Sequence, residues 1–117
     1  MIKNIRNKLG NRYQIFKKLH DLILFSSEGV EFRIFPIYIA YFFKDKNVAL
    51  IYYAGKLVRD GELDLGLNLK ENPTDKRFIK ADYMHYPGIT HSIKIRRLKD
   101  IDLTLAKIIK FACKLER

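Results

Sequence analysis

The sequence predicts an α+β fold, in which an antiparallel sheet of about five strands carries an N-terminal and a C-terminal helix on one face. Apolar residues recur at three- and four-residue steps near both ends of the chain and alternate with polar residues through its middle. The strand-like runs follow one another and are bounded by the two helices, an order typical of this class. The 117 residues match the usual size of one domain, so we expect a single domain over residues 1–117.

The first helix is expected at residues 11–25. Ile15, Leu19 and Ile23 form one apolar stripe at helical spacing. His20 lies beside this stripe, and we interpret it as a histidine of the core.

Five strands are expected after this helix. The pattern changes to β-branched and aromatic residues, and Pro, Gly, Asn and Asp interrupt it at intervals. The polar residues 44–47 separate two apolar runs and predict a hairpin turn. The expected strands are residues 30–35, 37–44, 48–53, 63–69 and 91–96.

The fourth of these strands has the clearest alternation in the chain. One face carries four leucines at positions 63, 65, 67 and 69. The other face carries Glu62, Asp64, Gly66 and Asn68. A sheet with one covered face and one wet face shows this pattern, so we expect Glu62 and Asp64 to face solvent.

The last helix is expected from Asp100 to about residue 115. Asp100 is a suitable N-cap, and Asp102 places a negative charge in the first turn, where the helix dipole favours it. Cys113 falls on the inner side of this helix and is interpreted as a buried, unreactive thiol.

The chain is strongly basic. The chain has 23 Lys and Arg against 13 Asp and Glu, a net charge of +10, and basic surfaces attract polyanions such as nucleic acids. The longest apolar run, residues 37–43, is far shorter than the roughly 20 residues of a membrane span. A single cysteine cannot form an internal disulfide, and no signal-peptide pattern is present. We therefore expect a cytoplasmic protein without a membrane partner.

No catalytic or metal-binding motif stands out. His20, His85, His91 and Cys113 do not have the spacing of zinc ligands. Glycine-rich phosphate loops and a nucleophile elbow are also missing. The sequence therefore predicts a non-enzymatic protein that requires no metal and no cofactor.

Residues 75–92 form a long connection, and long connections in small domains are often functional. They combine basic side chains, which neutralise phosphates, with planar rings, which stack on bases. The same mixture suits a small-molecule pocket, and the segment could equally fold over the sheet edge and fill the core with its aromatic residues. The candidate pocket residues are Tyr83, His85, Tyr86 and His91.

Three functions remain open. In the first, nucleic acid binds a basic face made by this connection and the last strand. The candidate contacts are Lys76, Arg77, Lys80, Lys94, Arg96, Arg97 and Lys99. In the second, a small molecule or nucleotide binds a pocket of tyrosines at positions 38, 52, 53, 83 and 86. In the third, an exposed strand edge pairs with a protein, as in a homodimer.

The sequence from residue 30 to residue 112 also resembles a family of small α+β domains. The resemblance rests on the strand Ile37-Tyr38-Ile39-Ala40-Tyr41, the strand at residues 63–69 with the polar break after it, and the turn His85-Tyr86-Pro87-Gly88. Residues 92–95, followed by Asp100-Ile101-Asp102 and an amphipathic helix, match as well. Members are described only as "predicted transport protein", and the fold is distantly similar to the YdhG-like fold. The family also occurs behind nuclease modules of restriction-type proteins, so the resemblance implies a non-catalytic domain with nucleic acid or a nuclease-type protein as partner.

Overall fold

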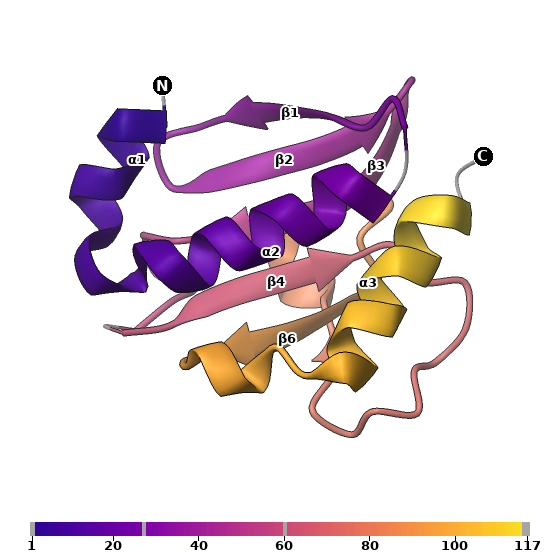
Figure 1. The fold of residues 1–117 in the computed structure, drawn as a ribbon. Helices are drawn as coiled ribbons and strands as arrows, with labels where there is room; N and C mark the ends of the chain where they lie inside the picture. The colour runs from indigo at the N-terminus through magenta and orange to yellow at the C-terminus, as the bar shows by residue number, and fades with distance from the viewer. Residues whose placement is uncertain (1, 27, 60, 116–117) are drawn as a thin grey trace.

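A computed structural model describes residues 2–26, 28–59 and 61–115, and in them six strands form one sheet with the helices on one side (Figure 1). The helices are α1 (Ile2–Leu9), α2 (Tyr13–Ser26) and α3 (Leu103–Leu115). Short 3-10 turns are η1 (Gly10–Arg12), η2 (Asp82–Met84) and η3 (Leu98–Asp100). The strands are β1 (Glu31–Ile34), β2 (Tyr38–Phe43), β3 (Lys46–Tyr52), β4 (Leu63–Leu67), β5 (Ile79–Lys80) and β6 (His91–Ile95).

The sheet has the strand order β1-β2-β3-β4-β6-β5, and each neighbouring pair is antiparallel. The predicted α+β class and the expected antiparallel sheet are confirmed. The prediction of about five strands was one too low, because β5 contributes only Ile79 and Lys80, too few residues to show alternation. The predicted hairpin is the β2–β3 connection, where Lys44 has a φ of 55°.

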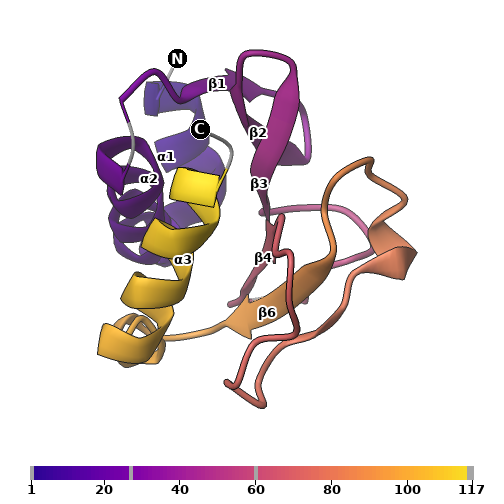
Figure 2. The same ribbon diagram turned by 90° about the vertical axis from the view of Figure 1, so that its right-hand side faces the viewer.

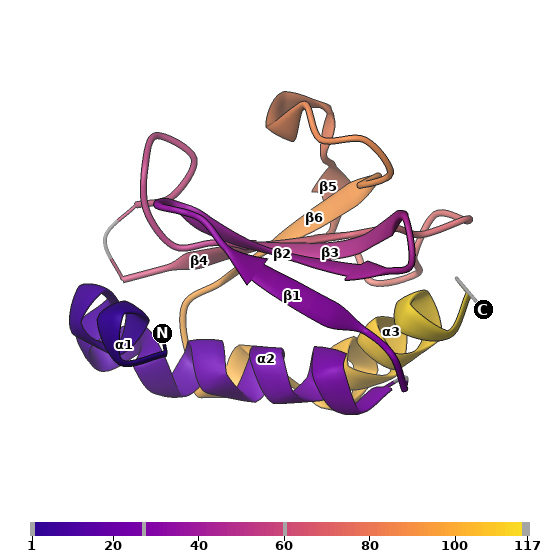
Figure 3. The same cartoon turned by 90° about the horizontal axis from the view of Figure 1, so that it is seen from above.

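All three helices lie on one face of the sheet (Figures 2 and 3). The stripe of α2 is buried against the sheet, as are Leu105 and Ile109 of α3 and the leucines of β4. His20 is a core residue, as expected: its Nδ1 lies 2.6 Å from the hydroxyl oxygen of Tyr41, and burial lowers its pKa. Cys113 is buried too, and burial raises the pKa of its thiol to about 12.

The last helix begins later than predicted. The amide of Leu105 donates to Oδ1 of Asp102 at 2.9 Å, so Asp102 is the N-cap of α3. The prediction of Asp100 as this cap was wrong, because Asp100 ends the separate turn η3. Its carboxylate accepts instead from the amides of Arg96 and Arg97, at 2.9 and 3.1 Å.

The second face of the sheet is also covered, although it was expected to be wet. Residues 81–90, here called the cover segment, lie across it and place Met84 and Ile89 over Gly66, where an added Cβ would be 2.7 Å from Cγ2 of Ile89. Tyr83 of the cover segment contacts Asp64, and Arg59, Lys94 and Arg96 surround Glu62. Glu62 and Asp64 are only 3% and 0% exposed, so the expectation that they face solvent was wrong. The alternation correctly separated the two faces, but it carried no information on the distant segment that covers the second.

A membrane span is not found in this fold, because none of the described helices is both long and apolar enough to form one.

Candidate nucleic-acid interface

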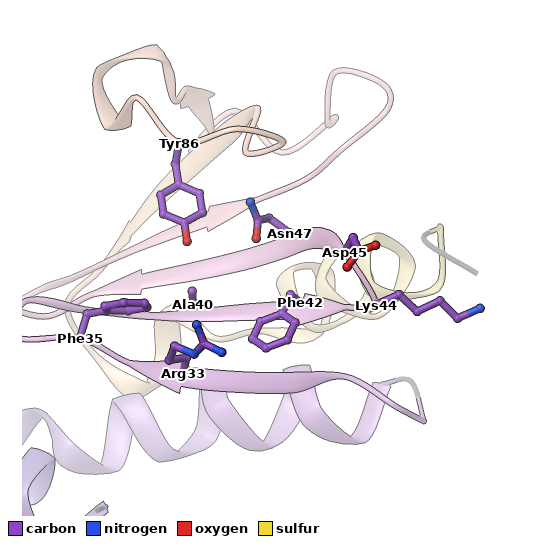
Figure 4. Close-up of a pocket in the computed structure, with 8 residues that line it drawn as sticks. All are labelled: Arg33, Phe35, Ala40, Phe42, Lys44, Asp45, Asn47 and Tyr86. Carbon is purple, nitrogen blue, oxygen red and sulfur yellow. The ribbon is translucent and has the colours of Figure 1, made fainter.

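A hollow of about 210 Å³ opens on the second face of the sheet, between β1–β3 and the cover segment (Figure 4). Its floor is the small side chain of Ala40 on β2. Its walls come from both neighbouring strands, the β2–β3 turn and the cover segment. The lining residues are Arg33, Phe35, Ala40, Phe42, Lys44, Asp45, Asn47 and Tyr86.

The strand pattern explains which side chains reach this hollow. Successive residues of β1 alternate between faces, so Phe32 and Ile34 join the helix-side core while Arg33 is left on the second face. Arg33 pairs with Ala40 in the β1–β2 register, and this small neighbour leaves space beside it. A bulge between Tyr41 and Phe42 interrupts the β2–β3 register beside Phe42, which lines the hollow.

Aromatic rings form a continuous wall at one end of the hollow. The rings of Phe35 and Tyr38 stack with centroids 4.6 Å apart and planes at 17°. Tyr38 also contacts Tyr52 at 5.0 Å and meets the edge of Tyr86 at 5.7 Å. Burial raises the pKa of Tyr52 and of Tyr86, so both phenols stay protonated and neutral at physiological pH.

Arg33 supplies a positive charge inside the hollow. Its side chain is exposed and reaches up from β1 while Tyr86 reaches down from the cover segment (Figure 4). The guanidinium carbon lies 5.9 Å from the ring centroid of Phe42. Within the described residues Arg33 makes no ion pair with a carboxylate. Its charge and its planar donors are therefore available to a ligand.

The rim of the hollow carries both charges. Lys44 extends away from the hollow in Figure 4, and its Nζ lies 5.4 Å from the ring centroid of Phe43. Asp45 stands beside it on the same turn. Arg33 is thus the cation that points inward, and Lys44 adds positive charge at one end.

Hydrogen bonds hold the cover segment in place over the sheet. The side-chain amide of Asn47 donates to the carbonyl of Pro87 at 2.9 Å. The amide of Thr90 donates to the carbonyl of Leu67 at 3.0 Å. Tyr86 directly precedes Pro87, so the first attachment holds the upper wall of the hollow near β3.

Two of the basic residues predicted from the sequence serve a different role in the structure. Nζ of Lys94 lies 2.8 Å from Oδ2 of Asp64, and Nε of Arg96 lies 3.1 Å from Oε2 of Glu62. Burial by itself raises the pKa of Glu62, but hydrogen bonds from the Arg59 amide and Arg96 and the charge of Lys94 outweigh it, and the pKa is lowered. These cations compensate buried carboxylates, which is the environment that a buried charge requires.

Arg77 also pairs with carboxylates. Its guanidinium lies 2.6 Å from Oδ2 of Asp75 and 3.1 Å from Oδ1 of Asp102, and it donates to the carbonyl of Asp100 at 2.9 Å. The four other predicted contacts are exposed and spread over the connection, β5 and the turn after β6: Lys76, Lys80, Arg97 and Lys99.

Asp64 is the centre of a separate buried polar cluster on the second face of the sheet. Its Oδ2 accepts from the hydroxyl of Tyr83 at 2.6 Å as well as from Lys94, and the Tyr83 oxygen lies 2.6 Å from Oγ of Ser92. Oδ1 of Asp64 is buried and makes no hydrogen bond within the described residues. Burial raises the pKa of Asp64, and it outweighs the hydrogen bonds from Lys94 and Tyr83.

The four predicted pocket residues do not come together. Tyr86 lines the hollow, whereas Tyr83 belongs to the Asp64 cluster. Nδ1 of His91 lies 2.8 Å from Oγ1 of Thr90. Its Nε2 lies 2.9 Å from Oδ1 of Asn72. His85 is exposed and follows η2 with a φ of 49°.

The tyrosines predicted to line a small-molecule pocket also lie in different parts of the structure. Tyr38 and Tyr52 share the aromatic wall with Tyr86, while Tyr53 is buried in the helix-side core. Sequence reasoning missed Arg33, Phe35 and Phe42. The available signal was the alternation Phe32-Arg33-Ile34, which places a lone cation on the face opposite two core residues.

Metal chemistry has no obvious location in this site. The described residues contain no cluster of three or more His, Cys, Asp or Glu side chains that could hold an ion.

Comparison with known proteins gave no significant match to a family model, to a curated protein or to a solved structure.

Proposed function

We propose that this protein is a non-catalytic module that binds single-stranded nucleic acid across the hollow on the second face of the sheet. The observation that carries the proposal is the position of Arg33, an exposed guanidinium that makes no ion pair within the described residues and lies beside the half-buried rings of Phe42 and Tyr86. Proteins bind single strands by stacking bases on aromatic rings and by neutralising phosphates with nearby cations. The net charge of +10 favours association with any such polyanion.

The size of the hollow favours this ligand over an enclosed small molecule. Pockets that bury a drug-sized ligand usually measure roughly 300–1,000 Å³, and this hollow measures about 210 Å³. It fits a single base or phosphate of a longer chain, which then continues over the rim. A cytoplasmic location, part of the same proposal, fits such a partner and a single cysteine held as a free thiol.

The direct test is fluorescence anisotropy with labelled single- and double-stranded DNA and RNA at two salt concentrations. We expect the wild type to prefer single strands, with an affinity that falls as salt rises because counterions are released from the phosphates. Arg33→Ala should weaken binding and reduce the slope of log K against log salt by roughly 0.7, the value for one phosphate contact on a single strand. Phe42→Ala should weaken binding by about 1–3 kcal/mol if a base stacks there.

Two further variants separate the hollow from general charge. Lys8→Ala removes an exposed cation of α1, on the opposite side of the sheet, and should change affinity only slightly. Arg33→Lys keeps the charge but loses the planar group, so it should retain the salt slope and lose part of the affinity. Equal losses in Arg33→Ala and Lys8→Ala would contradict the assignment of the hollow.

The basic face predicted from the sequence is tested in the same anisotropy assay. Arg97→Ala with Lys99→Ala removes two exposed cations near η3 without breaking a side-chain ion pair within the described residues. A larger loss in this variant than in Arg33→Ala would move the interface to that end of the sheet. A complete lack of oligonucleotide binding at low salt would reject the nucleic-acid function. Thermal-shift screening for a small ligand and a mass measurement for a homodimer would then follow.

A further inference from the structure

The helices α2 and α3 expose three large hydrophobic side chains. Phe25 of α2 is 84% exposed, and Leu103 and Phe111 of α3 are 71% and 61% exposed. Single exposed hydrophobic residues are ordinary, but a group of them on neighbouring helices marks an interaction surface. We call these three residues, with the lysines at positions 18, 107 and 110, the helix-layer patch.

Two hollows flank α3 within this patch. The first, of about 310 Å³, lies between α2 and α3, and its lining includes Leu22, Phe25 and Lys110. The second, of about 380 Å³, lies between α3 and the connection after β4, and its lining includes Ile108 and Phe111. Both hollows are partly apolar, so each can accept an apolar side chain from a partner.

The charges around the hollows are mainly positive. Lys18 and Lys110 line the first hollow, and Lys70 and Lys107 line the second. Asp21 lines the first hollow but is already paired with Lys17, with Nζ and Oδ1 2.7 Å apart. Glu71 lines the second hollow. Lys18, Lys107 and Lys110 make no ion pair within the described residues.

We propose that the helix-layer patch docks an acidic amphipathic helix of a partner protein. The apolar side chains of such a helix, spaced at i, i+3, i+4 and i+7, enter the hollows, and its carboxylates pair with the lysines around them. A second copy of this chain fits less well, because it would bring the same lysines against one another. An anionic membrane also fits less well, since a lipid surface cannot fill two separate hollows.

The test uses a fluorescein-labelled amphipathic peptide of about 18 residues, with Leu and Phe on one face and Glu on the other. A matched peptide carries Lys in place of every Glu. We expect micromolar binding of the Glu peptide and none of the Lys peptide. Phe25→Ser with Phe111→Ser should weaken the binding roughly tenfold or more, as expected for aromatic anchor residues.

A charge-reversal variant, Lys107→Glu with Lys110→Glu, leaves the apolar residues intact. It should lose the Glu peptide and gain affinity for the Lys peptide, which keeps the test valid if the serine variant proves unstable. Oligonucleotide binding should be unchanged in the serine variant, because the helices and the cover segment, which forms one wall of the nucleic-acid hollow, lie on opposite sides of the sheet (Figure 3). The two proposals therefore fail separately.

Four results would overturn this inference. The first is equal binding of the two peptides, and the second is no binding of the Glu peptide by the wild type. The third is binding of vesicles containing phosphatidylserine without binding of the peptide, which indicates a membrane surface. The fourth is a doubled mass that the serine variant abolishes, which indicates a homodimer.

Discussion

Replacing Lys94 by Met should destabilise the protein through the charge that it leaves behind. Asp64 is fully buried, its Oδ1 has no hydrogen bond, and Lys94 is one of two donors to its Oδ2. Removing one partner of a buried ion pair usually costs about 3–5 kcal/mol. The side chain of Lys94 is 36% exposed, so solvent screens the pair, and we expect about 2–3 kcal/mol.

The loss should depend on pH in a defined direction. Burial already raises the pKa of Asp64 above its ordinary value of 3.8, and losing Lys94 raises it further. A carboxyl group with a raised pKa in the folded state is fully compatible with folding in acid, and stability is lost as pH rises through the raised pKa. The difference between variant and wild type should therefore be small near pH 4 and complete at about pH 7.

Urea unfolding monitored by circular dichroism measures both effects. A double variant, Lys94→Met with Asp64→Asn, removes both charges and should recover most of the stability at neutral pH. Lys80→Met is the matched control, since it removes an exposed lysine that makes no ion pair in the described part of the chain. Its stability should stay within about 0.5 kcal/mol of the wild type. A loss below about 1 kcal/mol in Lys94→Met at neutral pH, or an equal loss at both pH values, would refute the reasoning.

Three further perturbations have expected outcomes. His20→Leu leaves the buried hydroxyl of Tyr41 without its partner and should cost about 1–3 kcal/mol in urea unfolding. Because burial lowers the pKa of His20 in the folded state, wild-type stability should fall as pH drops below 6.5, and this part of the pH dependence should disappear in the variant. Gly66→Ala pushes against Ile89, so it should cost about 1–3 kcal/mol and also weaken oligonucleotide binding by displacing the cover segment. Asp102→Ala should lower Tm by a few degrees, whereas Asp102→Asn, which can still cap α3, should lower it less. Equal decreases in Tm would assign the loss to the ion pair with Arg77 instead of the cap.

The sequence was most informative where local pattern decides the structure. The leucines of β4 all point to the helix-side core, and the helical stripe of α2 is buried as predicted. Asp102 rather than Asp100 caps α3, because two acids within three residues look equally suitable until the backbone path is known. The two-residue strand β5 has no periodic signal at all.

The candidate site was harder to predict because it depends on contacts between distant segments. Asp64 looks like a surface residue in its own strand, and its burial depends on Tyr83 and Lys94, which lie 19 and 30 residues later in the chain. Lys94 looks like a phosphate contact until Asp64, 30 residues earlier, is seen to bind it. Arg33 stands out only when its neighbour Ala40 and the ring of Tyr86 define a hollow around it.

The position of Tyr86 within the cover segment has a consequence for dynamics. The floor of the hollow belongs to the sheet, but one wall belongs to a segment without regular strand pairing over most of its length. A bound oligonucleotide that contacts both the sheet and the cover segment stabilises the cover segment in its observed position. By reciprocity, that position strengthens oligonucleotide binding by the same free energy. Amide hydrogen exchange in residues 82–90 should therefore slow when an oligonucleotide binds, while exchange in β4 changes little.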